Sequence, residues 1–111
     1  MTTKVIPSSG NVFRDLGFGP TEAEHLRIRS DLMAALEKLI DDRKLTQARA
    51  AALFGVSQPR VSDLVRGKID LFSIDALVQM LARAGVRTRV IVEPANTRLA
   101  RRSRKARLTS R

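Results

Sequence analysis

The chain has 111 residues, a net charge of +10 and no cysteine. This length suits one small domain with tails, and the missing cysteine excludes disulfides and thiolate metal sites. We expect a soluble, cytoplasmic protein, because no apolar run approaches the roughly 18 residues of a membrane span and no apolar signal segment begins the chain.

Most of the positive charge lies at the C-terminal end. Residues 95–111 carry seven basic side chains and no acid, which leaves +3 for residues 1–94. Such a balance favours a polyanionic partner, most commonly nucleic acid. A membrane surface fits less well, because this tail has almost no large apolar side chain to insert.

Residues 1–20 are interpreted as an N-terminal arm followed by an apolar clip. The stretch NVFRDLGFGP is unusually rich in large apolar side chains for a loop, namely Val12, Phe13, Leu16 and Phe18. We expect these side chains to cover the helical core, since a small core needs the buried area. The alternative is that they dock a partner protein.

A long helix is predicted from Thr21 to about Arg43, as the longest of the chain. Thr21 and Glu24 have the spacing of a capping box and follow Pro20. Apolar residues recur at helical spacing and form one broad face: Leu26, Leu32, Met33, Leu36, Leu39 and Ile40.

Two short helical patterns then meet at Gly55 within TQARAAALFGVSQPRVSDLVRGK, residues 46–68. Thr46 and Ser57 are suited to capping the two helices, and glycine permits the sharp turn between them. Ala51 lies where the helices would cross at close range. Further apolar contacts are expected from Ala48, Leu53, Val56, Val61 and Leu64. The pattern indicates a helix-turn-helix.

The outer side of the second motif helix is predicted to be polar. Its side chains are Gln58, Pro59, Ser62, Asp63 and Arg66, with Arg60 at the flank. A major groove about 12 Å wide admits such a helix and displays a distinct hydrogen-bonding pattern for each base pair. Arg66 and Lys68, in the basic turn that follows, suit phosphate contacts. The alternative is an ordinary helical domain that binds no nucleic acid.

Ser73 is predicted to cap a last helix, which closes the bundle and ends at Gly85. The sequence VRTRVIVEP then alternates β-branched and polar residues and predicts one short strand, with Thr88, Val90 and Val92 as its pairing residues. A solitary strand needs a partner. The candidates are residues 4–6, the same strand of a second copy, or the sheet edge of another protein.

Residues 95–111 are predicted to be a disordered basic tail, because they have too little apolar content to offset the entropy of ordering. Bound to DNA, this tail is expected to contact phosphates through Arg98, Arg101, Arg102, Arg104 and Lys105. The alternative is a solubilising tail.

No cofactor, metal site or catalytic site is predicted. Asp41 and Asp42 are adjacent, point roughly 100° apart on a helix, and have no third ligand nearby. His25 is expected at the surface. The serines lack a His or Lys base in any recognisable arrangement, and no phosphate-binding glycine loop is present, so we expect no enzymatic activity.

The motif resembles the helix-turn-helix of XRE/Cro-type repressors, in which Thr-Gln opens the first motif helix and Gly-Val-Ser-Gln begins the second. The resemblance implies a lambda-repressor-like fold and DNA-facing residues at Gln47, Gln58, Pro59, Arg60, Ser62 and Asp63. The predicted interface also includes Arg49, Ser57, Arg66 and Lys68. Arg49 stands where many relatives have Glu, so the reciprocal capping box is absent.

The resemblance extends over about residues 9–93 through SGNVFRDLGF, SQPRVSDLVRGK and FSIDALVQMLARAG, and residues 21–94 are interpreted as the domain. These stretches resemble small regulators, many of them antitoxins of HigBA-like toxin-antitoxin pairs. That implies repression of the protein's own promoter as a homodimer on a palindrome, and neutralisation of a small basic ribonuclease toxin by direct contact. The alternative is a stand-alone or phage-type XRE regulator without a toxin.

The fold class predicted from all these features is a small all-α bundle with a helix-turn-helix, one short C-terminal β-strand and the basic tail.

Overall fold

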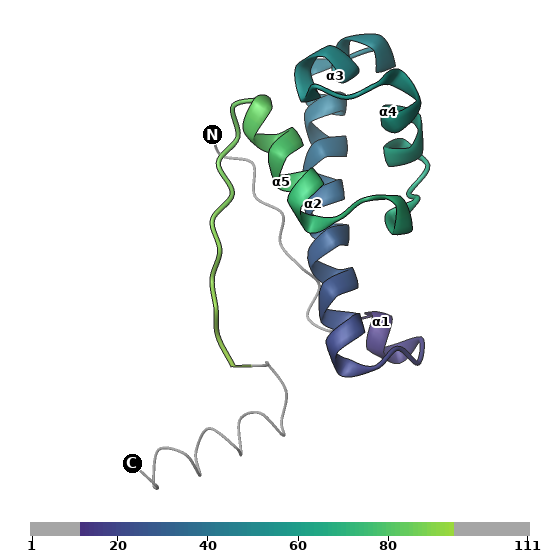
Figure 1. The fold of residues 1–111 in the computed structure, drawn as a ribbon, viewed down its shortest axis with the longest axis vertical. Coiled ribbons are helices and arrows are strands. Elements are labelled where there is room, and N and C mark those ends of the chain that lie inside the picture. Colours follow the sequence, from purple (N-terminus) through teal and green to yellow (C-terminus); the bar gives the residue numbers. More distant parts are fainter. Residues whose placement is uncertain (1–11, 95–111) are drawn as a thin grey trace, which may run out of the picture.

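A computed structural model describes residues 12–94, and all regular structure in that range is helical. The elements are α1 (Val12–Asp15), α2 (Pro20–Arg43), α3 (Gln47–Phe54), α4 (Gln58–Val65), the 3-10 turn η1 (Ile69–Leu71) and α5 (Ile74–Arg83). Figure 1 shows α2 as a long central rod, with α1 at its N-terminal end and the α3–α4 pair towards its other end. The predicted all-α bundle is confirmed.

The central helix α2 is the longest of the described elements, as predicted, but it begins differently. Its N-cap is Gly19, which makes no side-chain cap bond, and Thr21 already lies inside the helix. The predicted Thr21–Glu24 capping box is therefore wrong. Pro20 explains the earlier start, because its fixed φ suits the first turn and it has no amide that needs a partner.

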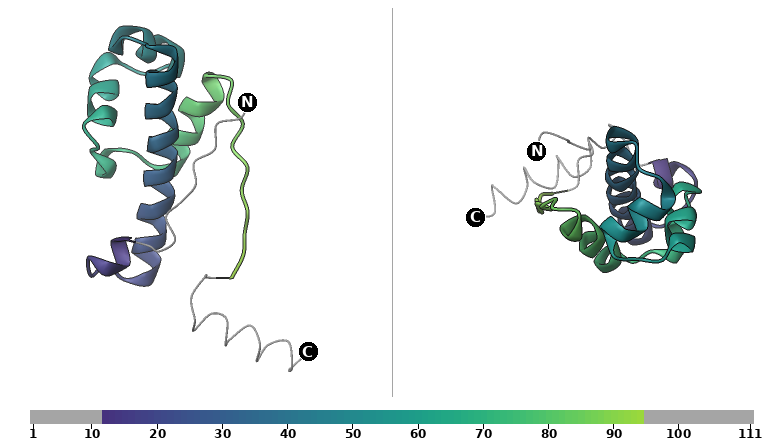
Figure 2. Two further views of the ribbon diagram at one scale, coloured as in Figure 1. Left: turned by 180° about the vertical axis from the view of Figure 1, so that it is seen from behind. Right: turned by 90° about the horizontal axis from the view of Figure 1, so that it is seen from above.

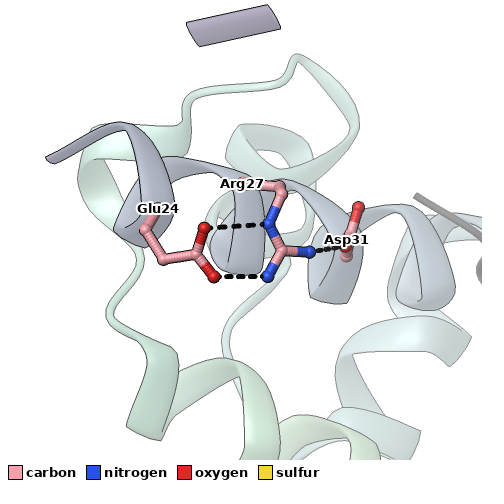
Figure 3. Close-up of polar contacts among 3 residues, drawn as sticks. All are labelled: Glu24, Arg27 and Asp31. Carbon is pink, nitrogen blue, oxygen red and sulfur yellow. Dashed lines mark hydrogen bonds and ion pairs between the residues drawn. The ribbon is translucent and has the colours of Figure 1, made fainter. Parts of the chain in front are cut away.

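Glu24 binds Arg27 instead of capping the helix (Figure 3). Arg27 Nη2 donates to Glu24 Oε2 at 2.6 Å, and Arg27 Nη1 donates to Asp31 Oδ2 at 3.1 Å. The hydrogen bond lowers the pKa of Glu24 and raises the pKa of Arg27. Burial raises the pKa of Asp31 because desolvation outweighs the attraction of Arg27.

One further carboxyl on α2 has a shifted pKa. Burial raises the pKa of Glu37, and the negative charge of Asp41 adds to the shift. Asp42, near the end of the same helix, pairs with Lys38 at 3.5 Å.

Helices α3, α4 and α5 begin at the predicted caps. The hydroxyl of each cap accepts a hydrogen bond from the backbone amide three residues on, at 3.1 Å for Thr46, 3.4 Å for Ser57 and 3.1 Å for Ser73. Each bond satisfies an amide that the helix itself leaves unpaired. The starts of α3, α4 and α5 therefore follow from local sequence.

One apolar core joins α2 to α3, α4 and α5. Its most completely buried large side chains are Leu36, Phe54, Val61, Leu64, Phe72, Leu77 and Met80. Fully burying a side chain of this size contributes about 1.5–3 kcal/mol. Ala51 is buried and Leu53 and Val56 pack on the core as predicted, whereas Ala48 is exposed, contrary to prediction. Phe54 and Phe72 were not predicted.

The N-terminal apolar stretch is not buried, so the expectation that it covers the core is wrong. Val12, Leu16 and Phe18 are 54, 69 and 40% exposed, and Phe13 is half-buried. Phe13 and Phe18 meet edge to face with ring centroids 6.2 Å apart. Four residues of α1 are too few to fold over the bundle, and they pack beside α2.

The predicted C-terminal strand is also wrong for the described part of the chain. Residues 86–94 have no regular structure and run as an extended line away from α5 (Figure 1). The amide of Val86 donates to Leu81 O at 2.9 Å and closes the end of α5. A strand needs a neighbouring strand, and the one candidate partner within the chain, residues 4–6, lies outside the described residues.

Within residues 12–94, no helix is long and apolar enough to cross a membrane, and no three His, Cys, Asp or Glu side chains gather in a group that could hold a metal ion.

Candidate nucleic-acid interface

The turn between α3 and α4 depends on Gly55. Its φ is 72°, and its amide donates to Ala51 O. Residues other than glycine rarely adopt this backbone conformation, which costs them about 1–2 kcal/mol. A Cβ at this position would also clash with the side chain of Arg83 on α5. The predicted role of Gly55 is confirmed on both grounds.

Helix α4 has one apolar and one polar side. Val61 and Leu64 are fully buried and fix the rotation of the helix against the core. Gln58 and Pro59 are exposed, and Ser62 and Asp63 are half-exposed. The core side chains therefore hold the polar side of α4 outward.

The remaining residues of the predicted interface are accessible too. Gln47 and Arg49 on α3, Ser57 before α4, and Arg66 and Lys68 after it are all exposed. All of the predicted DNA-facing residues therefore lie on the packed α3–α4 pair and the turn after it, between residues 47 and 68.

Arg60 has contacts inside the protein that were not predicted from the sequence. Its Nη1 donates to Leu71 O at 2.8 Å, and its guanidinium lies over the Phe72 ring, 4.1 Å from the ring centroid. The side chain is half-exposed. It therefore ties α4 to the segment after η1. No local pattern signals this contact, because it joins residues 11 and 12 positions apart.

The basic turn after α4 is ordered by backbone hydrogen bonds. Gly67, at φ 73°, donates to Leu64 O at 3.0 Å, and Lys68 donates to Asp63 O at 3.1 Å. Arg29 of α2 then reaches the next residue, with its Nη1 donating to Ile69 O at 3.2 Å. The turn carrying Arg66 and Lys68 is thus flanked by contacts to α4 and α2.

Two apolar side chains beside this turn were not predicted to be accessible. Val65, the last residue of α4, is 42% exposed, and Leu71 is 49% exposed. Apolar side chains at such a surface are suited to contact a thymine methyl group or a sugar.

The predicted pairing residues lie away from α4. Thr88 is half-buried, whereas Val90 and Val92 are 79 and 92% exposed. Figures 1 and 2 place the segment 86–94 and α4 on different sides of α2. The predicted phosphate contacts of the tail, from Arg98 to Lys105, lie outside the described residues.

Comparisons with known proteins agree with this geometry. A family model described as a helix-turn-helix domain matches residues 12–93. A solved structure described provisionally as an XRE family transcriptional regulator is 31% identical, with a TM-score of 0.62, and the alignment covers 69% of this chain and 86% of that one. Among curated proteins no match is found. The chain therefore belongs to the XRE-type helix-turn-helix family.

Proposed function

We propose that the protein is a DNA-binding transcriptional regulator that places α4 in the major groove of an operator. The observation that carries this proposal is the outward polar side of α4, held by buried Val61 and Leu64. A helix in this position reads base edges through its first residues. Such a protein acts at the nucleoid, in the cytoplasm.

Five side chains of the interface have roles that follow from their chemistry. Gln58 is suited to form two hydrogen bonds with adenine, and Asp63 is suited to accept a hydrogen bond from the amino group of cytosine. Arg49, Arg66 and Lys68 are suited to phosphates, where they set position and affinity but read no sequence. The operator is proposed to be a palindrome bound by two copies of the chain.

The test begins with selection of duplexes from a random library on the full chain, followed by binding of the selected and a scrambled duplex. Gln58→Ala should cost about 1–3 kcal/mol on the selected duplex and little on the scrambled one. Lys68→Ala should weaken both and reduce the salt slope by about 1. His25→Ala, exposed on α2, is the matched control. Failure to enrich any sequence would contradict the proposal.

The protein is further proposed to be the antitoxin of a toxin-antitoxin pair that neutralises a small basic ribonuclease by direct contact. The specific observation in favour is the exposed apolar group on and beside α1, made of Val12, Leu16 and Phe18. It lies at the opposite end of α2 from α3 (Figure 1), so a partner confined to that end leaves α3 uncovered. A stand-alone regulator without a toxin is the alternative.

A low-salt pull-down from the native cell tests this second role. The antitoxin role requires a captured small basic protein that cleaves RNA when freed and is inhibited when the chain is added back. Leu16→Asp should abolish that inhibition while binding of the selected duplex stays intact. Absence of any ribonuclease inhibited by the chain would favour the stand-alone regulator.

A further inference from the structure

The 3-10 turn η1 is held by two guanidinium groups that come from different helices. Arg29 of α2 donates through Nη1 to Ile69 O at 3.2 Å. Arg60 of α4 donates through Nη1 to Leu71 O at 2.8 Å. The two acceptors are the first and the last carbonyl of η1. This short turn is therefore tied at one end to the central helix and at the other end to the proposed reading helix.

The bond from Arg29 is one that the backbone of η1 does not need. The amide of Phe72 also donates to Ile69 O, at 3.3 Å. A carbonyl oxygen has two lone pairs and can accept both bonds. Removing the guanidinium therefore leaves Ile69 O with a partner, and what is lost is the tie between η1 and α2.

The surroundings of Arg29 offset the stability that this bond contributes. Its side chain is half-buried, and its Nε is buried without a hydrogen-bond partner among the described residues. It forms no ion pair with a carboxylate of the described chain. Burying an unpaired N–H group costs free energy comparable to the gain from one hydrogen bond. We therefore expect Arg29 to add little to the stability of the bundle and to act mainly on the position of η1.

Lys68 is the interface residue that lies next to this tie. It directly precedes Ile69, and its side chain is exposed. Its amide donates to Asp63 O at 3.1 Å, and its carbonyl accepts from the amide of Leu71, also at 3.1 Å. The backbone of Lys68 is thus bonded to both α4 and η1. A displacement of η1 therefore also displaces Lys68, and a charged hydrogen bond to a phosphate forms only over a narrow range of distances.

We propose that Arg29 is a positioning residue for DNA binding, which acts through η1 on the phosphate contact of Lys68. The inference rests on the proposed function, because it requires a duplex against which Lys68 is placed. Arg29 uses its Nη1 on a carbonyl inside the protein and is half-buried, which favours an indirect role over a phosphate contact of its own.

Binding of the selected and the scrambled duplex at several salt concentrations measures the effect. Arg29→Met keeps a long apolar side chain and removes the tie, so affinity should fall roughly fivefold. Both duplexes should be affected alike, because a phosphate contact reads no sequence. The logarithmic slope with salt should fall by up to about 0.9, the value for one phosphate. Arg29→Lys, which keeps a donor for Ile69 O, should regain most of the affinity.

A double-mutant cycle with Lys68→Ala separates positioning from direct contact. In the Lys68→Ala background, Arg29→Met should change neither the affinity nor the salt slope further. Losses that simply add would show that Arg29 contacts a phosphate by itself, and would overturn the proposal. Arg27→Met is the matched control, because it removes the same charge from the same helix at a side chain that binds Glu24 and Asp31. It should bind both duplexes as wild type does.

Hydrogen exchange of the free protein tests the tie without DNA. The amides of Leu71 and Phe72 close η1, so they should exchange faster in Arg29→Met than in wild type, while the amides of α5 do not change. Unchanged exchange at these two amides would overturn the positioning role whatever the affinity. Loss of the helices in Arg29→Met by circular dichroism would overturn it too, because the role would then be stability. A chain that selects no duplex would instead contradict the proposed function.

Discussion

Arg60 illustrates how one side chain is divided between two surroundings. Its position near the start of α4 makes it a candidate for contact with DNA, yet its guanidinium stacks on Phe72 and donates to Leu71 O. The planar guanidinium can do both, because its several donors point to more than one side. We infer that Arg60 holds the segment after η1 against α4.

This role predicts a loss of stability that is independent of DNA. Arg60→Ala should lower the free energy of unfolding by about 1–2 kcal/mol, from the hydrogen bond and the stacking together. Urea denaturation of the free protein measures it. The unfolding free energy of Arg60→Lys should lie between those of wild type and Arg60→Ala, since lysine keeps the charge but has no planar group to stack on Phe72.

Arg66→Ala is the matched control, because Arg66 is exposed at the C-cap of the same helix. Its unfolding free energy should stay within about 0.5 kcal/mol of wild type. Equal stability of Arg60→Ala and wild type would show that the Leu71 and Phe72 contacts contribute nothing.

The helices of the bundle differ in how they begin. Helices α3, α4 and α5 each have a hydroxyl cap, whereas α2 starts from Gly19 and Pro20 without one. A helix of eight residues, such as α4, has few internal bonds, so one satisfied amide is a large share of its stability. The 24 residues of α2 are packed along its length, so this helix depends on its cap much less.

This difference predicts unequal losses of stability for two similar substitutions. Ser57→Ala should lower the unfolding free energy by about 1 kcal/mol through loss of the α4 cap. Thr21→Ala, inside α2 and exposed, should change it by less than about 0.5 kcal/mol. Thermal denaturation of both variants decides it. A larger loss for Thr21→Ala would restore the capping box that the structure contradicts.

The carboxyls of α2 predict a pH dependence of stability. The folded pKa of Glu24 is lowered from 4.5 by its hydrogen bond with Arg27, so its contribution is present above that value and is lost as pH falls through the folded pKa. Glu24→Gln should therefore be less stable than wild type at neutral pH, by less than about 1 kcal/mol because the pair is exposed. The difference should vanish once the pH has fallen below the folded pKa of Glu24.

Asp31 provides a control in which stability depends on pH in the opposite direction. Its raised folded pKa favours the folded state as pH falls, so Asp31→Asn should lose stability more steeply in acid than wild type does. Urea denaturation across this pH range measures both profiles. A Glu24→Gln deficit that persists undiminished in acid would show that the pair does not act through ionisation.

Over the whole sequence, most of the net positive charge lies outside the proposed reading surface. Residues 95–111 carry +7 of the net +10, whereas the predicted interface between residues 47 and 68 mixes bases with Asp63. The interface therefore carries a net charge of +3, from Arg49, Arg60, Arg66 and Lys68 against Asp63, which is less than half of the charge of residues 95–111. We expect the C-terminal segment to supply the larger share of the non-specific attraction to DNA.

Deleting residues 97–111 should therefore weaken binding to every duplex and flatten the dependence of affinity on salt. The logarithmic slope should fall by about 0.9 for each phosphate that the shortened chain no longer neutralises. Titrations at several salt concentrations measure it, with deletion of residues 108–111, which removes one charge, as the length control. An unchanged slope would assign the segment another role.

Local chemistry made much of the fold predictable from the chain. The three hydroxyl caps, the left-handed Gly55 and the apolar face of α2 depend on residues within one or two turns, and each was found where the pattern placed it. The outward polar side of α4 followed in the same way, because buried Val61 and Leu64 leave only one rotation for the helix.

Packing between distant segments decided the rest. Phe72 is buried under Arg60, Arg29 reaches Ile69 across 40 positions, and the N-terminal apolar group stays exposed beside α2. Periodicity says which side chains prefer burial, but not whether another element is close enough to bury them. Residues 86–94 have the pattern of a strand and form none within the described chain, because a strand exists only where a second one supplies its hydrogen bonds.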